Sequence, residues 1–192
     1  MQVLCPAQGV PFIPKGIRLT SVLNPALVWC RVRPRQVLAA TAALCVGLLA
    51  FGLYLQHVVG LEPCPMCIVQ RYTLVLVALV AGVGAVFERP LWQKVVAVKL
   101  LFLAGFGAFV AARQSWLQWN PPEVASCGRD FYGMIESFPL QRVVPMIFKG
   151  SGDCAAIDWT FLGLTIANWS FLNFLLIAAV AVGLLVARPR HG

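Results

Sequence analysis

Four long apolar stretches, separated by shorter polar segments, dominate the hydrophobic pattern of the chain. Each holds about 20 residues with few or no charges, which is enough for an α-helix to cross the hydrocarbon core of a bilayer. The predicted spans are residues 37–59, 68–87, 91–112 and 166–187. The pattern therefore predicts an all-α fold, an integral membrane bundle of four helices.

Composition excludes a soluble protein of this length. Hydrophobic residues make up 60% of the 192 residues, charged residues only 11%, and the mean hydropathy is +0.82. Residues 1–36 are polar and basic without a helical period, so we expect an unstructured tail there, and residues 188–192 form a short C-terminus. A signal peptide is not expected, because the first apolar run starts too late and is too long.

The basic residues set the expected orientation. The tail, residues 88–99 and the C-terminus hold ten Lys and Arg and one acid, whereas the rest of the chain holds five Lys and Arg and six acids. An excess of Lys and Arg marks the cytoplasmic side. We therefore expect both termini in the cytoplasm and two outer loops, residues 60–67 and 113–165. The net charge of +8 is a topology signal rather than a nucleic-acid signal.

The longer outer loop contains an apolar segment, Phe138–Phe148, with one charge. It is too short to span the bilayer, so we expect it to lie along the membrane surface.

Cysteines are the candidate chemical groups of the outer loops. Four of the seven lie there, on the oxidising side where disulfides persist: Cys64, Cys67, Cys127 and Cys154. Cys45 lies near the middle of the first span, where a thiol behaves as a small apolar side chain.

Cys64 and Cys67 are separated by only two residues and stand just before the second span. A helix N-terminus and a nearby Arg both lower the pKa of a thiol and make it reactive. Arg71 follows Cys67 by four residues, so on a helix the two share one face.

Three interpretations of these cysteines remain open. They could form structural disulfides, a four-thiolate zinc site, or a relay that passes electrons by thiol–disulfide exchange. A disulfide across two residues stabilises little, and a second close pair for zinc is missing. The relay fits a reactive pair near the membrane and a second pair on a long loop. No motif for a soluble cofactor is present, so a lipid-soluble oxidant such as a quinone is the expected acceptor.

Topology, cysteine spacing and flanking residues together resemble the DsbB family of bacterial disulfide bond formation proteins. The resemblance covers about residues 37–187. Besides the cysteines and Arg71, the matching stretches are Leu117-Gln118, Val144-Pro145, Gly152-Asp153-Cys154 and Trp159 to Leu164.

This resemblance implies a protein-dithiol:quinone oxidoreductase of the bacterial inner membrane, monomeric, with its active site facing the periplasm. It implies a DsbA-like dithiol protein as partner and ubiquinone or menaquinone as electron acceptor. By match, Cys127 forms the mixed disulfide with the DsbA-like protein, and Cys154 is its loop partner. Cys64 exchanges with that pair, and Cys67 is the thiolate that contacts the quinone.

Two further residues match the quinone site of the family. Arg71 corresponds to its arginine, which would stabilise the anion developing on the quinone or on Cys67. Many members carry a His just after the third span, where this chain has Gln114. A neutral amide can donate a hydrogen bond but cannot carry charge.

Rival functions come from other classes. A vitamin K epoxide reductase-like enzyme also uses a Cys-x-x-Cys, but late in its chain. A disulfide-stapled scaffold would keep its cysteines oxidised and inert, and a DsbB paralogue could serve one dedicated substrate. A transporter is disfavoured, because Arg71 and Lys99 are the only ionisable groups well inside the spans, both near their ends.

Overall fold

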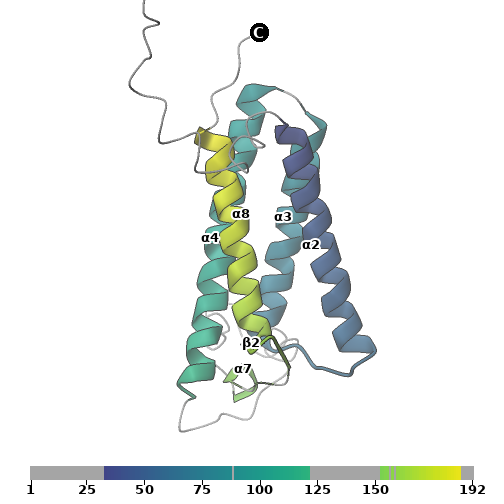
Figure 1. The fold of residues 1–192 in the computed structure, drawn as a ribbon, viewed down its shortest axis with the longest axis vertical. Helices are drawn as coiled ribbons and strands as arrows, with labels where there is room; N and C mark the ends of the chain where they lie inside the picture. Colours follow the sequence, from purple (N-terminus) through teal and green to yellow (C-terminus); the bar gives the residue numbers. More distant parts are fainter. Residues whose placement is uncertain (1–32, 88, 122–151, 156, 158, 187–192) are drawn as a thin grey trace, which may run out of the picture.

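The computed structural model describes residues 33–87, 89–121, 152–155, 157 and 159–186. Four long helices run side by side (Figure 1): α2 (Pro34–His57), α3 (Pro65–Val86), α4 (Pro90–Trp119) and α8 (Ile166–Val186). Each is long and apolar enough to cross a membrane. The predicted all-α, four-helix membrane fold is confirmed, and the protein is a multi-pass membrane protein. The cytoplasmic location of both termini stays a prediction from the charge distribution.

Three of these helices begin with a proline in their first turn: Pro34, Pro65 and Pro90. Proline suits the start of a helix, because its φ is already helical and its missing N–H has no helical partner there. As a result α3 starts at Pro65, before the predicted position 68, and includes Cys67.

The helix α4 continues past the predicted end of its span at Ala112, up to Trp119. Arg113 and Gln114 had indicated a loop because they are polar, but neither breaks a helix. Asn120 follows as the C-cap, and Pro121 stands next in the chain. The extension carries Gln114 on a rigid element.

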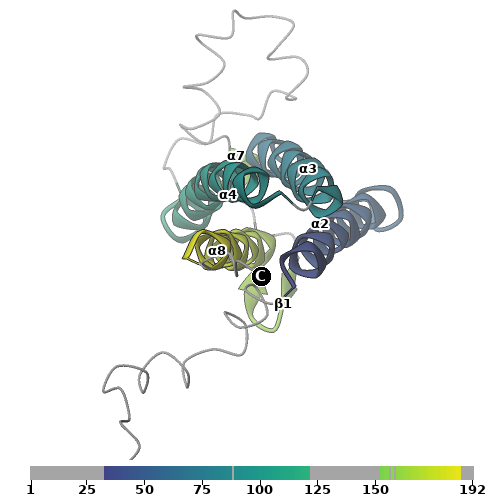
Figure 2. The ribbon, with the colours of Figure 1, turned by 90° about the horizontal axis from the view of Figure 1, so that it is seen from above.

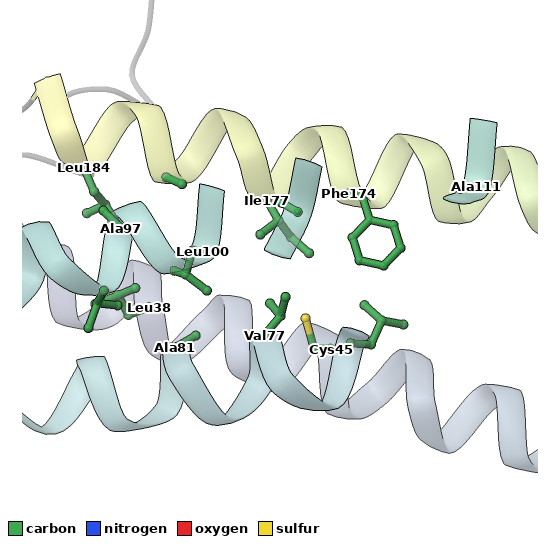
Figure 3. Close-up of a cluster of buried hydrophobic side chains, with 14 residues drawn as sticks. Leu38, Cys45, Val77, Ala81, Ala97, Leu100, Ala111, Phe174, Ile177 and Leu184 are labelled. Atoms are coloured by element: carbon green, nitrogen blue, oxygen red, sulfur yellow. The ribbon is translucent and has the colours of Figure 1, made fainter. Parts of the chain in front are cut away.

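The helices pack in the order α2, α3, α4 and α8 around a common core, and among the four neighbouring pairs α2 and α8 make the least contact (Figure 2). The core is a continuous cluster of buried aliphatic side chains with one aromatic ring, Phe174 (Figure 3). Cys45 lies in this cluster, fully buried among apolar neighbours, in the role predicted for it.

The short elements gather at the end of the bundle where α2 connects to α3 (Figure 1). They are the short helix α7 (Gly152–Ala155) and an antiparallel hairpin of β1 (Thr160–Phe161) and β2 (Leu164–Thr165). Trp159, just before the hairpin, contacts Phe51 of α2 edge to face, with ring centroids 5.9 Å apart. Trp169 of α8 donates a hydrogen bond to the Phe161 carbonyl. The hairpin is thus tied to both α2 and α8.

Some expectations concern residues outside the described ranges. These residues are most of the N-terminal tail, Cys127, the Phe138–Phe148 segment and residues 188–192.

Candidate thiol–disulfide site

The N-terminus of α3 places the first two cysteines. Cys64 is the N-cap, with an extended backbone conformation, and its Sγ accepts a hydrogen bond from the Cys67 backbone N–H at 3.3 Å. The helical turn that follows brings the two sulfurs to 2.8 Å from each other, as thiols of which either can donate. Cys64 is buried and Cys67 half-buried. The sequence spacing therefore produces a close pair, as expected.

The third predicted cysteine lies against this pair. Cys154 of α7 is 1% exposed and packs in a small cluster with Cys64, Met66, Val110 and Leu117. Residues 90 positions apart in the chain are thus packed into one buried cluster. Cys127, the fourth predicted cysteine, lies outside the described residues.

The surroundings of Cys64 favour its protonated form. Its pKa is raised above the ordinary value, first by the hydrogen bond with Cys154, then by the bond with Cys67 and by burial. Removing a proton from Cys64 would place negative charge in an apolar cluster beside two other sulfurs. Between the two helix-start cysteines, Cys64 is therefore the one suited to hold a proton.

Gln114 of α4 faces the pair from the next helix. Its side-chain Nε2 donates to Cys64 Sγ at 3.3 Å and to Cys67 Sγ at 3.2 Å, and its Oε1 accepts from Gln70 Nε2 at 2.8 Å. Gln114 is only 4% exposed. A buried amide donor next to sulfur stabilises negative charge that develops there.

Arg71 has a different environment from the one that its spacing suggests. It lies one turn after Cys67 on α3, but among the described residues its guanidinium hydrogen-bonds to α2. It donates to Gln56 Oε1 and, at 3.0 Å, to the Gly52 carbonyl. The guanidinium is therefore held against the neighbouring helix α2.

Gln70 and Gln56 are site residues that the sequence reasoning missed. Gln70 is an uncharged polar residue three positions after Cys67 within an apolar span, and this placement was the signal that could have found it. Gln56 lies near the end of its span and resembles an ordinary interfacial residue. Its hydrogen bond with Arg71 is recognised only once the helices are packed.

The described sulfurs are spaced differently from the thiolate ligands of a zinc ion. No group of three or more His, Cys, Asp or Glu side chains within the described ranges could hold a metal. Two thiolates on a tetrahedral zinc, with Zn–S of about 2.3 Å, would lie about 3.8 Å apart. The sulfurs of Cys64 and Cys67 are closer than that, at 2.8 Å.

Comparison with known proteins gives a consistent result. The family model described as "Disulfide bond formation protein DsbB" matches residues 34–184. A protein of Polaromonas naphthalenivorans named disulfide bond formation protein B is 69% identical over 158 residues, which is 82% of this chain and 95% of that protein. Proteins of the same name from Polaromonas sp. strain JS666 and Paracidovorax citrulli are 67% and 63% identical, over 86% and 84% of this chain and 98% and 93% of their own lengths. The chain therefore belongs to the DsbB family of disulfide bond formation proteins.

Proposed function

We propose that this protein reoxidises a DsbA-like dithiol protein in the periplasm and passes the electrons to a membrane quinone. It would do so from the bacterial inner membrane, as a protein-dithiol:quinone oxidoreductase that supports disulfide bond formation. The names of its relatives speak of disulfide bond formation and are consistent with this proposal. The quinone, the DsbA-like partner and the inner-membrane location belong to the proposal.

The packing of Cys154 and Cys64 in one buried cluster carries the proposal. In the exchange, a Cys154 thiolate attacks Cys64 Sγ of an oxidised Cys64–Cys67 pair. A Cys154–Cys64 bond forms, the Cys64–Cys67 bond breaks, and Cys67 leaves as a thiolate. Exchange is faster when the leaving sulfur is stabilised as an anion, and Gln114 donates to Cys67 at 3.2 Å. The second loop cysteine, Cys127, then attacks Cys154, releases Cys64 and restores the loop disulfide.

The energetics of the relay favour a reduced pair that is held by hydrogen bonds. A DsbA-type couple is strongly oxidising, at about −120 mV, so a more reducing acceptor pair takes its electrons uphill. Each ~30 mV corresponds to about 1.4 kcal/mol for two electrons. Donors aimed at the sulfurs stabilise the dithiol state and reduce this difference. Gln114 is such a donor for both sulfurs.

The residues around Cys67 fit a quinone. Cys67 is half-buried in the first turn of α3, at the end of a membrane-spanning helix. The half-buried Arg71 uses two N–H groups on α2, which leaves further guanidinium donors for a quinone carbonyl. When bound, a quinone supplies the capacity to take up two electrons and two protons. Cys67 and Cys64 would supply these electrons and protons as their disulfide re-forms, and Cys64 is the sulfur that would keep its proton longest.

The decisive experiment is quinone reduction by the purified protein in detergent, started with a reduced DsbA-like protein and followed by quinone absorbance. We expect turnover that Cys67→Ser and Cys127→Ser each abolish. Cys45→Ala is the matched control, because Cys45 is fully buried in the helix core and away from the other sulfurs. Absence of turnover, together with outer cysteines that do not react with a thiol-trapping reagent, would instead establish a stapled scaffold.

Arg71 has its own test. Arg71→Met should raise the quinone concentration needed for half-maximal turnover, and Arg71→Lys should do so less, because it keeps the charge. Unchanged quinone affinity and turnover in Arg71→Met would show that this residue only fastens α3 to α2.

A further inference from the structure

A pair of glutamine amides lies buried between α3 and α4, directly behind the cysteine pair. Gln70 Nε2 donates to Gln114 Oε1 at 2.8 Å, and both residues are only 4% exposed. Buried side-chain amides are costly unless their donors and acceptors are paired. Gln70 hydrogen-bonds to one end of the Gln114 side-chain amide, and the other end of that amide donates to two sulfurs. The contact between the two glutamines therefore affects the sulfurs that react.

The direction of the bond between the amides decides what the sulfurs meet. An amide has a donor end and an acceptor end, and a rotation of about 180° exchanges them. Gln70 donates to Oε1 of Gln114, and this leaves Nε2 of Gln114 to point toward Cys64 and Cys67 at 3.3 and 3.2 Å. The opposite orientation would turn a carbonyl oxygen toward the sulfurs, where it repels a thiolate.

We propose that Gln70 is a positioning residue, which holds the Gln114 amide with its donor end toward the cysteine pair and thereby stabilises the dithiol state against the disulfide. The proposal rests on the redox activity of the pair proposed above, but on neither the quinone nor the partner protein. Near the pair, the described residues also include Cys154, which packs in the same cluster as Cys64, and Arg71, whose guanidinium hydrogen-bonds to α2.

A purely structural role is the alternative. Side-chain amides also link membrane helices by hydrogen bonds, and in that case Gln70 would affect the packing of α3 on α4 without affecting the sulfurs. The two roles differ in their effect on the redox equilibrium of the cysteine pair, which packing alone would leave unchanged.

The experiment measures the equilibrium between dithiol and disulfide at Cys64 and Cys67 in dithiothreitol buffers. Cys127→Ala and Cys154→Ala form the background, so that no loop cysteine exchanges with the pair. The redox state is read by alkylation and mass spectrometry of the peptide that carries both residues. Gln70→Leu should lower the reduction equilibrium constant about tenfold, a potential about 30 mV more negative, because the amide donor to both sulfurs is no longer held in place.

Two further variants help to separate the positioning role from a purely structural one. Gln70→Glu keeps the size of the side chain, and its carboxylate accepts from Gln114, so it should lower the constant at neutral pH at least as much as Gln70→Leu. It also replaces Gln70→Leu if that variant does not fold. Thr73→Val is the matched control, since Thr73 is buried on the same helix but donates to its own helix at Val69. It should leave the constant within about twofold.

A double variant tests whether Gln70 acts through Gln114. Gln114→Leu should lower the constant, and Gln70→Leu added to it should lower it no further, since effects of residues that act as one unit do not add. Additive effects of the two substitutions would overturn the positioning role and leave the proposed function intact. A Gln70→Leu variant with lower thermal stability but an unchanged constant would do the same. A pair that dithiothreitol never opens would overturn this role and the proposed function together.

Discussion

Gly107 is the residue at which a single methyl group should disturb the bundle most clearly. A Cβ added there would lie 2.4 Å from Cε1 and 2.5 Å from Cζ of Phe174, the fully buried ring of α8. Carbon atoms pack best at about 3.5–4.0 Å, so the ring or the helix would have to move by about 1 Å. The ring is enclosed by the core, which makes Gly107→Ala an overpacking change.

The cost of this change follows from two opposing effects. Overpacking of a closed core costs about 1–3 kcal/mol, whereas Ala is favoured over Gly in a helix interior by about 1 kcal/mol in water-soluble hosts. We expect Gly107→Ala to lower the free energy of unfolding by up to about 2 kcal/mol. Gly105 is the matched control on the same helix, because an added Cβ there meets nothing within 4 Å. Gly105→Ala should be neutral or stabilising.

Both variants can be compared by unfolding in mixed micelles, with the fraction of sodium dodecyl sulfate at the midpoint and the thermal midpoint as measurements. Phe174→Leu, introduced into Gly107→Ala, should recover part of the loss, so that the double variant is less destabilised than the sum of the single ones. If Gly107→Ala unfolded at the same midpoints as Gly105→Ala, the close approach of α4 to α8 at this ring would be refuted.

Three further changes test other parts of the structure. Leu162 has φ +52°, a left-handed conformation that costs an ordinary residue about 1–2 kcal/mol. Leu162→Gly should therefore raise the thermal midpoint of unfolding. An unchanged or lower midpoint would contradict backbone strain at this residue. Thr165→Val removes the hydroxyl that accepts from the Asn168 N–H and should cost about 1 kcal/mol of unfolding free energy, whereas Thr165→Ser should cost less. Cys154 is the first cause of the raised pKa of Cys64, so Cys154→Ala should lower that pKa. In a Cys67→Ser background, alkylation of Cys64 should therefore begin at lower pH. An unshifted pH profile would exclude Cys154 as the cause.

The sequence predicted the fold well, because the lipid environment constrains it strongly. A span must be helical and apolar, so the positions of the four helices follow from hydropathy alone. The ends of the helices were less accurate. Gln114 was expected in a loop because polarity was taken as the membrane boundary, but a helix ends where capping or proline ends it. On α4 that point comes only after Trp119.

The site was predictable where it depended on local spacing. Two cysteines at a helix start must come close to each other, and they do. The partners of Arg71 and Gln70 were not predictable, because they depend on how α3 is rotated against α2 and α4. A rotation of one residue, about 100°, would exchange these partners, and only the packing of the whole core fixes it.

The contacts around the start of α3 suggest which sulfur would move in the proposed exchange. Arg71 fastens this helix to α2, and Gln70 fastens it to α4 through Gln114. Cys67 belongs to the helix and is therefore held in place on two sides. Cys154 instead belongs to α7, a helix of four residues that touches the bundle mainly at α4. In the proposed relay the fixed pair would keep Cys67 at one position beside the membrane, while the motion needed to bring sulfurs together and apart would occur in the segment that carries Cys154.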